Sequence, residues 1–224
     1  MAEDLGYWEQ KIAQMLRIVF FSLLFTTIVK CKNEVTLPYY NTPDFTPIFL
    51  NKQEAKKLIY HSISDFEFDS DKDIKISKKT LKNKVHVASF IFTQCTNICP
   101  VMINNLKALE KKYKNSDDFA ILSFSVTPWI DSVQKLKSFV KDNEIKMKNW
   151  FFLTGEKSKI YKLARKSYFA EEILGFTKDS TDFLHTEHVL LVDKNFKIRG
   201  IYNSTLSLEI KNLSADIDIL LKNK

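Results

Sequence analysis

The sequence predicts an α/β protein, a three-layer sandwich with a mixed central sheet. Two continuous apolar runs, residues 85–92 and 119–126, have the composition of strands that are buried on both faces. A segment with apolar residues at helical spacing follows each run, and the chain closes with a hairpin and a last helix. Strands buried on both faces need helices above and below the sheet, and this gives three layers.

The elements alternate along the chain. In order, we expect paired strands at 66–68 and 74–76, a strand at 85–92, a helix opened by Pro100, a strand at 119–126, a helix at 131–142, a short strand at 151–153, a helix at 157–165, a hairpin from 189–193 and 197–202, and a helix at 206–221. This succession is the thioredoxin-like plan. Proline suits the first turn of a helix, where its missing N–H costs nothing.

Composition limits the class of protein. The 224 residues suffice for one domain of ordinary size plus a leader, and 45% hydrophobic residues exclude a disordered chain. The net charge is +7, but the lysines are spread along the chain and form no dense basic element. We therefore expect no nucleic-acid binding. We expect a monomer.

The N-terminal 31 residues have the features of an export leader. Arg17 precedes an apolar run at 18–29, which is shorter than the roughly 20 residues that span a bilayer. Cys31 follows this run directly, as in a bacterial lipoprotein signal, in which that cysteine is lipidated. Lys30 stands where such signals usually have a small residue, so an uncleaved membrane anchor is the alternative. Residues 1–14 precede a better start at Met15 and are read as a misassigned start or a short cytoplasmic tail.

These features divide the chain into three parts. Residues 1–31 are the leader or anchor, and residues 32–47, with three prolines, are an extended tether. Residues 48–224 are the folded domain. We expect this domain in the periplasm of a bacterial cell envelope, held to the membrane through the leader.

Two cysteines carry the predicted chemistry. Cys95 and Cys99 lie between a buried strand and a helix, four residues apart, and their Cα atoms are expected about 6 Å from each other. This spacing permits a disulfide and also lets two thiolates bind one metal ion. The positive end of the helix favours the thiolate form. The alternative is a pair of buried cysteines that only fill space.

The donor set favours copper among metals. Two thiolates suit a soft ion such as Cu(I), whereas structural zinc needs four protein ligands that this chain does not offer. One imidazole would complete a trigonal site. His61 is expected at the surface and His86 within a strand, packed or facing outward. His185 and His188 are three residues apart, on opposite faces of an extended segment, so at most one can face the cysteines.

Two motifs resemble the Sco/SenC family. Residues 90–102 (FIFTQCTNICPVM) resemble its Cys-x-x-x-Cys-Pro segment, and residues 183–187 (FLHTE), with the hairpin that follows, resemble its histidine loop. Asp131 and residues 150–155 (WFFLTG) also match the family pattern. The chain departs from the pattern in three places, Leu184, Thr127 and Phe196, and the last stands where the hairpin turn usually has glycine.

The resemblance implies a function. It assigns the copper ligands to Cys95, Cys99 and His185, one copper per chain, and a role in assembling the dinuclear copper site of cytochrome c oxidase, whose copper-bearing subunit would be the partner. We expect a copper-delivering assembly factor rather than an enzyme. The alternatives are a thiol–disulfide reductase that acts on that site through Cys95 and Cys99, and a peroxidase-like or purely structural domain.

Overall fold

A computed structural model describes residues 14–15, 36–170 and 186–222 of the chain. The chain divides into two compact units, Met1–Val35 and Thr36–Lys224, and the second contains the sheet. Cys31 and His185, two of the predicted site residues, lie outside the described residues. Within the described part, no helix has the length and apolar character needed to cross a bilayer.

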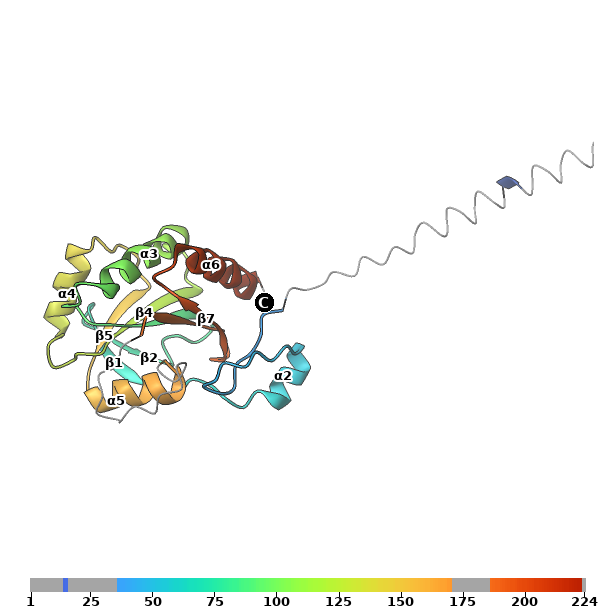
Figure 1. Cartoon of the computed structure of the whole chain (residues 1–224), viewed down its shortest axis with the longest axis horizontal. Coiled ribbons are helices and arrows are strands. Elements are labelled where there is room, and N and C mark those ends of the chain that lie inside the picture. Colours follow the sequence, from blue (N-terminus) through green and yellow to red (C-terminus); the bar gives the residue numbers. More distant parts are fainter. Residues whose placement is uncertain (1–13, 16–35, 171–185, 223–224) are drawn as a thin grey trace, which may run out of the picture. The chain divides into compact units, whose positions relative to one another are not determined.

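The second unit alternates strands and helices as expected (Figure 1). Its elements are α2 (Lys52–Leu58), β1 (Glu67–Ser70), β2 (Lys75–Ser77), β3 (Val85–Ile91), α3 (Ile98–Tyr113), β4 (Phe119–Ser125), α4 (Val133–Asp142), β5 (Trp150–Thr154), α5 (Lys157–Lys162), a π-helical turn η1 (Leu163–Ser167), β6 (His188–Val192), β7 (Ile198–Asn203) and α6 (Ser207–Lys222). Every strand and helix expected from the sequence is present.

The described strands form one mixed sheet in the order β2-β1-β5-β4-β3-β6-β7. Strands β3, β4 and β5 are parallel neighbours, while β1 and β6 pair with them in the antiparallel sense. The carboxyl ends of the three parallel strands therefore meet at one edge of the sheet, which we call the carboxyl edge. The β6–β7 turn lies at the opposite edge, because Val192 at the end of β6 pairs with His86 near the start of β3.

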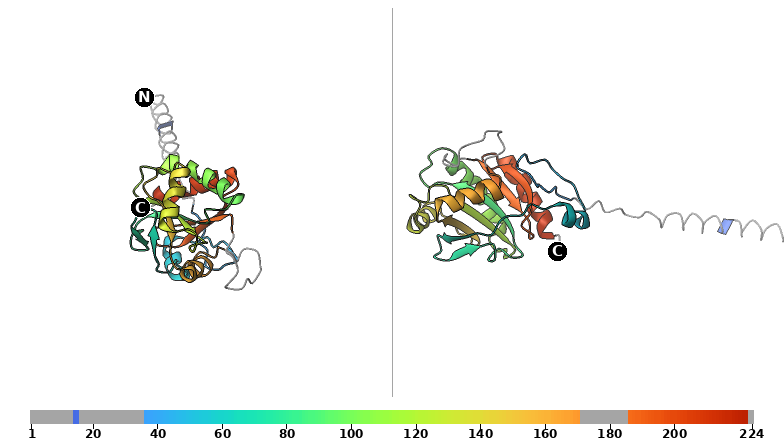
Figure 2. Two further views of the ribbon diagram at one scale, coloured as in Figure 1. Left: turned by 90° about the vertical axis from the view of Figure 1, so that its left-hand side faces the viewer. Right: turned by 90° about the horizontal axis from the view of Figure 1, so that it is seen from below.

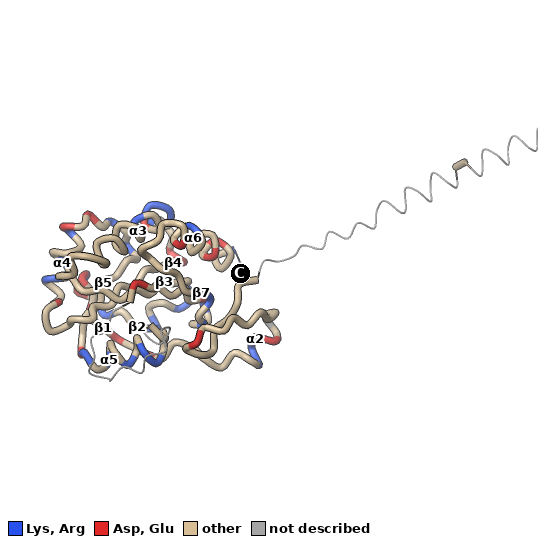
Figure 3. Tube along the Cα trace, viewed as in Figure 1, with Lys and Arg blue, Asp and Glu red and all other residues tan. Residues whose placement is uncertain are grey.

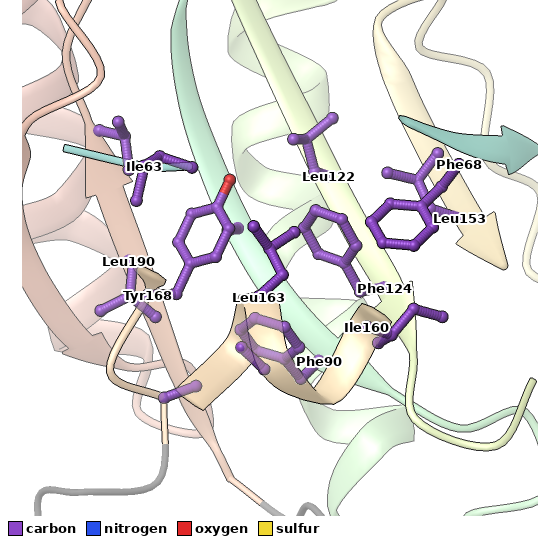
Figure 4. Packing of buried hydrophobic residues seen from close by; sticks show 14 of the residues in the cluster. Ile63, Phe68, Phe90, Leu122, Phe124, Leu153, Ile160, Leu163, Tyr168 and Leu190 are labelled. Carbon is purple, nitrogen blue, oxygen red and sulfur yellow. The ribbon is translucent and has the colours of Figure 1, made fainter. Parts of the chain in front are cut away.

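Helices cover both faces of the sheet, which confirms the three-layer, thioredoxin-like sandwich (Figures 1 and 2). One core lies between the sheet and helices α3, α4 and α6. The other lies beneath α5 and η1 and is rich in aromatic rings, with Phe90, Phe124 and Tyr168 in mutual contact (Figure 4). Successive β3 residues alternate between the two cores, which explains why every residue of this strand is buried.

Most strand ends and the ends of α6 lie one or two residues from their expected positions, and three other helix boundaries also differ. Helix α3 begins at Ile98, two residues before Pro100, and α4 begins at Val133 behind the N-cap Ser132, so Asp131 precedes the helix. The helix expected to reach residue 165 becomes the π-helical turn η1 at Leu163. Boundaries are the least certain feature of a pattern, because caps and tertiary contacts decide them.

The described part of the expected tether packs against the domain. Arg199 donates hydrogen bonds to the carbonyls of Leu37 (2.6 Å) and Pro38 (2.9 Å), and its guanidinium lies 3.7 Å from the centre of the Tyr39 ring. Tyr39 also pairs with Ile48 as an isolated bridge. Residues 36–47 accordingly belong to the compact unit that contains the sheet.

Helix α2 was not expected from the sequence. Asn51 and Glu54 form a capping box at its start: the Asn51 side chain accepts from the Glu54 amide, and the Glu54 carboxylate accepts from the Asn51 amide. Its buried residues Ala55 and Ile59 pack on Tyr39. With seven residues, the helix depends on these contacts.

The β6–β7 hairpin accommodates an unusual turn residue. Phe196 adopts a positive φ of 60°, a conformation that glycine adopts without strain. Its ring contacts His86 and lies beneath the Lys78 ammonium, at 4.8 Å, and these contacts offset the backbone strain. Gly200 in β7 has a different role, because a Cβ there would clash with the hydroxyl and ring of Tyr202.

Candidate metal centre

Three segments meet at the carboxyl edge of the sheet. The cysteine loop follows β3 and the loop with Asp131 follows β4, and these strands end side by side because Ile91 pairs with Ser125. Strand β6 runs antiparallel to β3, with Ala88 opposite Leu190, so the chain enters β6 at this same edge through Thr186 and Glu187. The topology thus brings the cysteine loop and the start of β6 to one side of the domain.

Cys95 and Cys99 form the chemical centre of this edge. Both are free thiols; Cys95 is half-buried and Cys99 is buried, with 7% of its surface exposed. The Cys95 amide donates to the Phe92 carbonyl at 3.2 Å, and the Cys99 amide donates to the Cys95 sulfur at 3.4 Å. The Cys95 sulfur therefore lies against the first turn of α3, which carries Cys99, and a single metal ion or a disulfide could join the two sulfurs there.

The two thiols differ in their acidity. Burial raises the pKa of the Cys99 thiol to about 12, and the neighbouring Cys95 and Asp131 act in the same direction. Burial also acts to raise the pKa of Cys95, but backbone N–H groups of Cys99, Asn97 and Ile98 outweigh it, and the net effect lowers that pKa. Cys95 is consequently the reactive, half-exposed thiol and Cys99 the protonated, buried one.

Asp131 holds the cysteine loop against the loop after β4. It is fully buried and accepts four hydrogen bonds: from the Thr93 amide (3.3 Å), the Thr93 hydroxyl (2.6 Å), the Ser125 hydroxyl (2.6 Å) and the Thr127 hydroxyl (2.9 Å). Thr93 lies two residues before Cys95, so Asp131 fixes the base of the loop that carries the thiols. Sequence reasoning found Asp131 through the family resemblance alone and did not find Ser125, because no local pattern marks a tertiary hydrogen bond.

The described histidines lie in three different environments. His86 is buried near the start of β3, away from the cysteines, and its Nε2 lies 3.1 Å from the Tyr168 hydroxyl. His61, expected at the surface, is half-buried.

 The Nε2 of His61 lies 2.8 Å from the Ser167 carbonyl oxygen, and the His61 ring packs on Phe169. His188, half-buried at the start of β6, has its Nδ1 3.3 Å from the Thr186 hydroxyl.

The predicted ligands are therefore described only in part. The structure brings Cys95 and Cys99 together at the carboxyl edge, and the third predicted ligand, His185, lies outside the described residues. Among residues 36–170 and 186–222, no three His, Cys, Asp or Glu side chains gather as a metal-binding group. The described donor set is a pair of thiols, which suits a soft metal ion and needs a further ligand to hold it.

The fold and the loop define a thioredoxin-like protein with a Cys-x-x-x-Cys pair at the carboxyl edge of its sheet. Comparison with known proteins makes this class specific: the SCO1/SenC family model matches residues 54–221, and the chain belongs to that family. The SCO1 protein homolog of Bacillus subtilis (strain 168) is 32% identical over 167 residues, which are 74% of this chain and 86% of the relative.

Solved structures agree with this assignment. A SCO1/SenC family lipoprotein from Bacillus anthracis str. Ames superposes with a TM-score of 0.62 at 27% identity, covering 72% of this chain and 96% of that one. BsSco superposes with a TM-score of 0.62 at 31% identity, covering 73% of this chain and 95% of that one. BsSco is described as a member of the Sco family of cytochrome c oxidase assembly proteins with a disulfide switch.

Proposed function

We propose that this protein is a copper-binding assembly factor that delivers copper to the dinuclear copper site of cytochrome c oxidase. One copper per chain would be held by Cys95, Cys99 and His185. The observation that carries the proposal is the pair of neighbouring free thiols, with Cys95 half-exposed and its sulfur accepting from the Cys99 amide, at the edge of the sheet where the chain enters β6. Membership in the SCO1/SenC family supports it.

The chemistry of the donors fits copper. Two thiolates and one imidazole are soft and borderline ligands that suit Cu(I), and they are too few for a structural zinc site. His185 directly precedes Thr186, which is buried at the entrance to β6 on the cysteine side of the sheet. His188 is the weaker choice for the imidazole, because its Nδ1 already lies beside the Thr186 hydroxyl.

A thiolate-rich site needs a route for copper release. If the acceptor arrives with a disulfide, the Cys95 thiolate attacks one acceptor sulfur and forms a mixed disulfide. This first exchange releases one acceptor thiol. Cys99 then attacks the Cys95 sulfur of the mixed disulfide and releases the other acceptor thiol. Two electrons pass to the acceptor, which leaves as a dithiol, while Cys95 and Cys99 end as a disulfide. Because a disulfide is a poor metal ligand, copper then moves to the two new acceptor thiolates, and copper loading and disulfide formation exclude each other.

The difference between the two thiols favours a second candidate, a thiol–disulfide reductase acting on the same oxidase site. A half-exposed thiol with a lowered pKa and a buried thiol with a raised pKa are the attacking and resolving groups that such a reaction uses. The reductase has no need of an imidazole at position 185, and copper delivery requires it.

The test separates the two candidates through that histidine. Copper-loaded protein is mixed with the soluble domain of the oxidase's copper-bearing subunit in its disulfide form, and copper transfer is measured. Oxidase assembly is measured in cells that carry His185→Ala or Cys95→Ser. Copper delivery predicts that both variants fail. If His185→Ala supports assembly as well as the wild type while Cys95→Ser does not, the protein is a reductase.

We further propose that Cys31 is lipidated and holds the domain as a monomer on the periplasmic side of a bacterial membrane. The described lipoprotein relative from Bacillus anthracis supports this attachment. Mass spectrometry of the native N-terminus tests it, because lipidation removes residues 1–30 and adds acyl mass to Cys31. A free Cys31 thiol with residues 1–30 still attached would indicate an uncleaved anchor.

A further inference from the structure

Helix α2 and its flanking residues expose large apolar side chains. Phe49, Leu58 and Tyr60 have 66%, 57% and 75% of their surfaces exposed. Lys56 and Lys57, immediately before Leu58, are also exposed. We call these five residues the α2 patch. Large apolar side chains that gather on one short solvent-exposed segment mark an interaction site more often than single exposed residues do.

Packing of the neighbouring residues fixes the outward direction of the Phe49 and Tyr60 side chains. Ile48 and Leu50, on either side of Phe49, pack against the small core that contains Tyr39 and Ala55. Ile59, between Leu58 and Tyr60, is buried in the same core. Because neighbours in extended chain point to opposite sides, Phe49 and Tyr60 are directed away from that core. Their exposure is therefore a consequence of the fold around α2.

The α2 patch lies at the end of the sheet opposite the cysteines. Lys197, in the β6–β7 turn, donates to the carbonyls of Ile59 (3.0 Å) and His61 (2.7 Å) and ties the segment to that turn. The turn and the cysteine loop flank opposite ends of β3, whose seven residues span about 20 Å. Figures 1 and 2 show α2 on the side of the domain away from α4, which follows the Asp131 loop.

The charges beside the patch favour an anionic surface. Lys56 and Lys57 adjoin Leu58, and the acidic residue of the helix, Glu54, accepts a hydrogen bond from the Asn51 amide in the capping box. Figure 3 shows basic and acidic positions side by side on α2. Exposed apolar and aromatic side chains next to lysines are the composition that binds the headgroup region of anionic bilayers. The chain carries a net charge of +7, which adds attraction to such a surface.

The length of chain before the domain fits a bilayer as the occupant. Tyr39, near the start of the compact unit at Thr36, belongs to the same small core as α2. Cys31 precedes Thr36 by five residues, which reach at most about 18 Å when extended. A lipid on Cys31 would therefore hold the start of the domain, and α2 with it, close to the bilayer surface.

We propose that the α2 patch docks the domain on an anionic lipid surface and directs the cysteine loop away from the membrane. The proposal rests on the membrane attachment in the proposed function. Docking leaves the Cys95 edge free to meet an acceptor that projects from the membrane, and it restricts the orientations that a tethered domain would otherwise sample.

The test uses the full chain reconstituted in vesicles of phosphatidylcholine, with or without phosphatidylglycerol. Hydrogen exchange of residues 48–61 should slow severalfold in vesicles that contain phosphatidylglycerol. The triple variant Phe49→Ser, Leu58→Ser, Tyr60→Ser and the double variant Lys56→Glu, Lys57→Glu should each abolish this slowing. The matched control is Leu206→Ser with Leu208→Ser, since these leucines are equally exposed at the start of α6, at 54% and 65%.

Each other result would overturn the proposal. Equal exchange in both kinds of vesicle would exclude docking on anionic lipid, and slowing that persists in detergent without lipid would indicate contact with a second protein chain. Co-sedimentation with the vesicles and copper stoichiometry are measured on the same samples. Loss of sedimentation in Cys31→Ser would report on the anchor and loss of copper on the metal site, so failure of either is distinguishable from failure of docking.

Discussion

Removing the Asp131 carboxylate tests how the cysteine loop is held. Asp131→Ala leaves four donors without their acceptor, and two of them, the Ser125 and Thr127 hydroxyls, belong to buried residues. An unsatisfied buried donor costs about 1–3 kcal/mol, so we expect a loss of about 3–5 kcal/mol in the free energy of unfolding. Asp131→Asn keeps one oxygen and the shape of the side chain, and it should cost about 1–2 kcal/mol.

Urea unfolding at neutral pH, followed by the fluorescence of buried Trp150, measures these losses. The control is Asp65→Ala, whose carboxylate is 96% exposed and pairs with Lys78 at 3.7 Å, and which should cost less than about 1 kcal/mol. The reasoning would be refuted if Asp131→Ala were as stable as Asp65→Ala. It would also be refuted if Asp131→Asn were the more damaging of the two Asp131 variants.

Three further predictions follow from buried or half-buried groups. Burial lowers the pKa of His86 to about 3, so on acidification the unfolded chain takes up this proton before the folded chain does. The free energy of unfolding should therefore fall as the pH falls from about 6.5 toward 3, at up to about 1.4 kcal/mol per pH unit. His86→Leu should reduce this slope in acid unfolding curves, and an unchanged slope would contradict the assignment. Alkylation of the reduced protein near pH 8 should modify Cys95 at least about a hundredfold faster than Cys99, because only Cys95 has a lowered pKa and partial exposure. Peptide mass spectrometry measures the two rates, and equal rates would contradict the burial of Cys99. Gly200→Ala should lower the midpoint of thermal unfolding, because its Cβ would displace the Tyr202 side chain from Asp216. Tyr202→Phe in the same chain should not restore the midpoint, since the ring carbons Cε2 and Cζ would still lie 2.6 and 2.7 Å from that Cβ. An unchanged midpoint in Gly200→Ala would contradict this reasoning.

Local patterns were sufficient for the layers of the fold. The run at 85–92 predicted β3, because a strand that is buried on both faces is apolar at nearly every position. The helical spacing of apolar residues after Pro100 predicted α3, because a helix that is buried on one face repeats its apolar residues every three or four positions. The same reasoning could not find α2, which is short and polar and is stabilised by Asn51, Glu54 and contacts with Tyr39. A capping box over residues 51–54 was the available signal.

The cysteine pair of the candidate site was visible in the sequence, and its surroundings were not. The spacing of Cys95 and Cys99 is a local property, and in the structure Cys99 lies in the first turn of α3 and Cys95 in the loop before it. The hydrogen bonds between Thr93, Ser125 and Asp131 join two loops across neighbouring strands, so only the folded topology reveals them. The difference in acidity between the two thiols likewise depends on burial, which sequence spacing does not encode.

The most direct test of the central claim is metal analysis of the reduced full chain reconstituted with copper. The account predicts one copper per chain, an intense sulfur-to-copper charge-transfer band with Cu(II), and loss of both in Cys95→Ala with Cys99→Ala. His185→Ala should weaken copper binding strongly, while His188→Ala should change it little, because the two side chains lie on opposite faces of an extended segment. Copper binding that survives removal of both cysteines, or that depends on His188 rather than His185, would contradict the account.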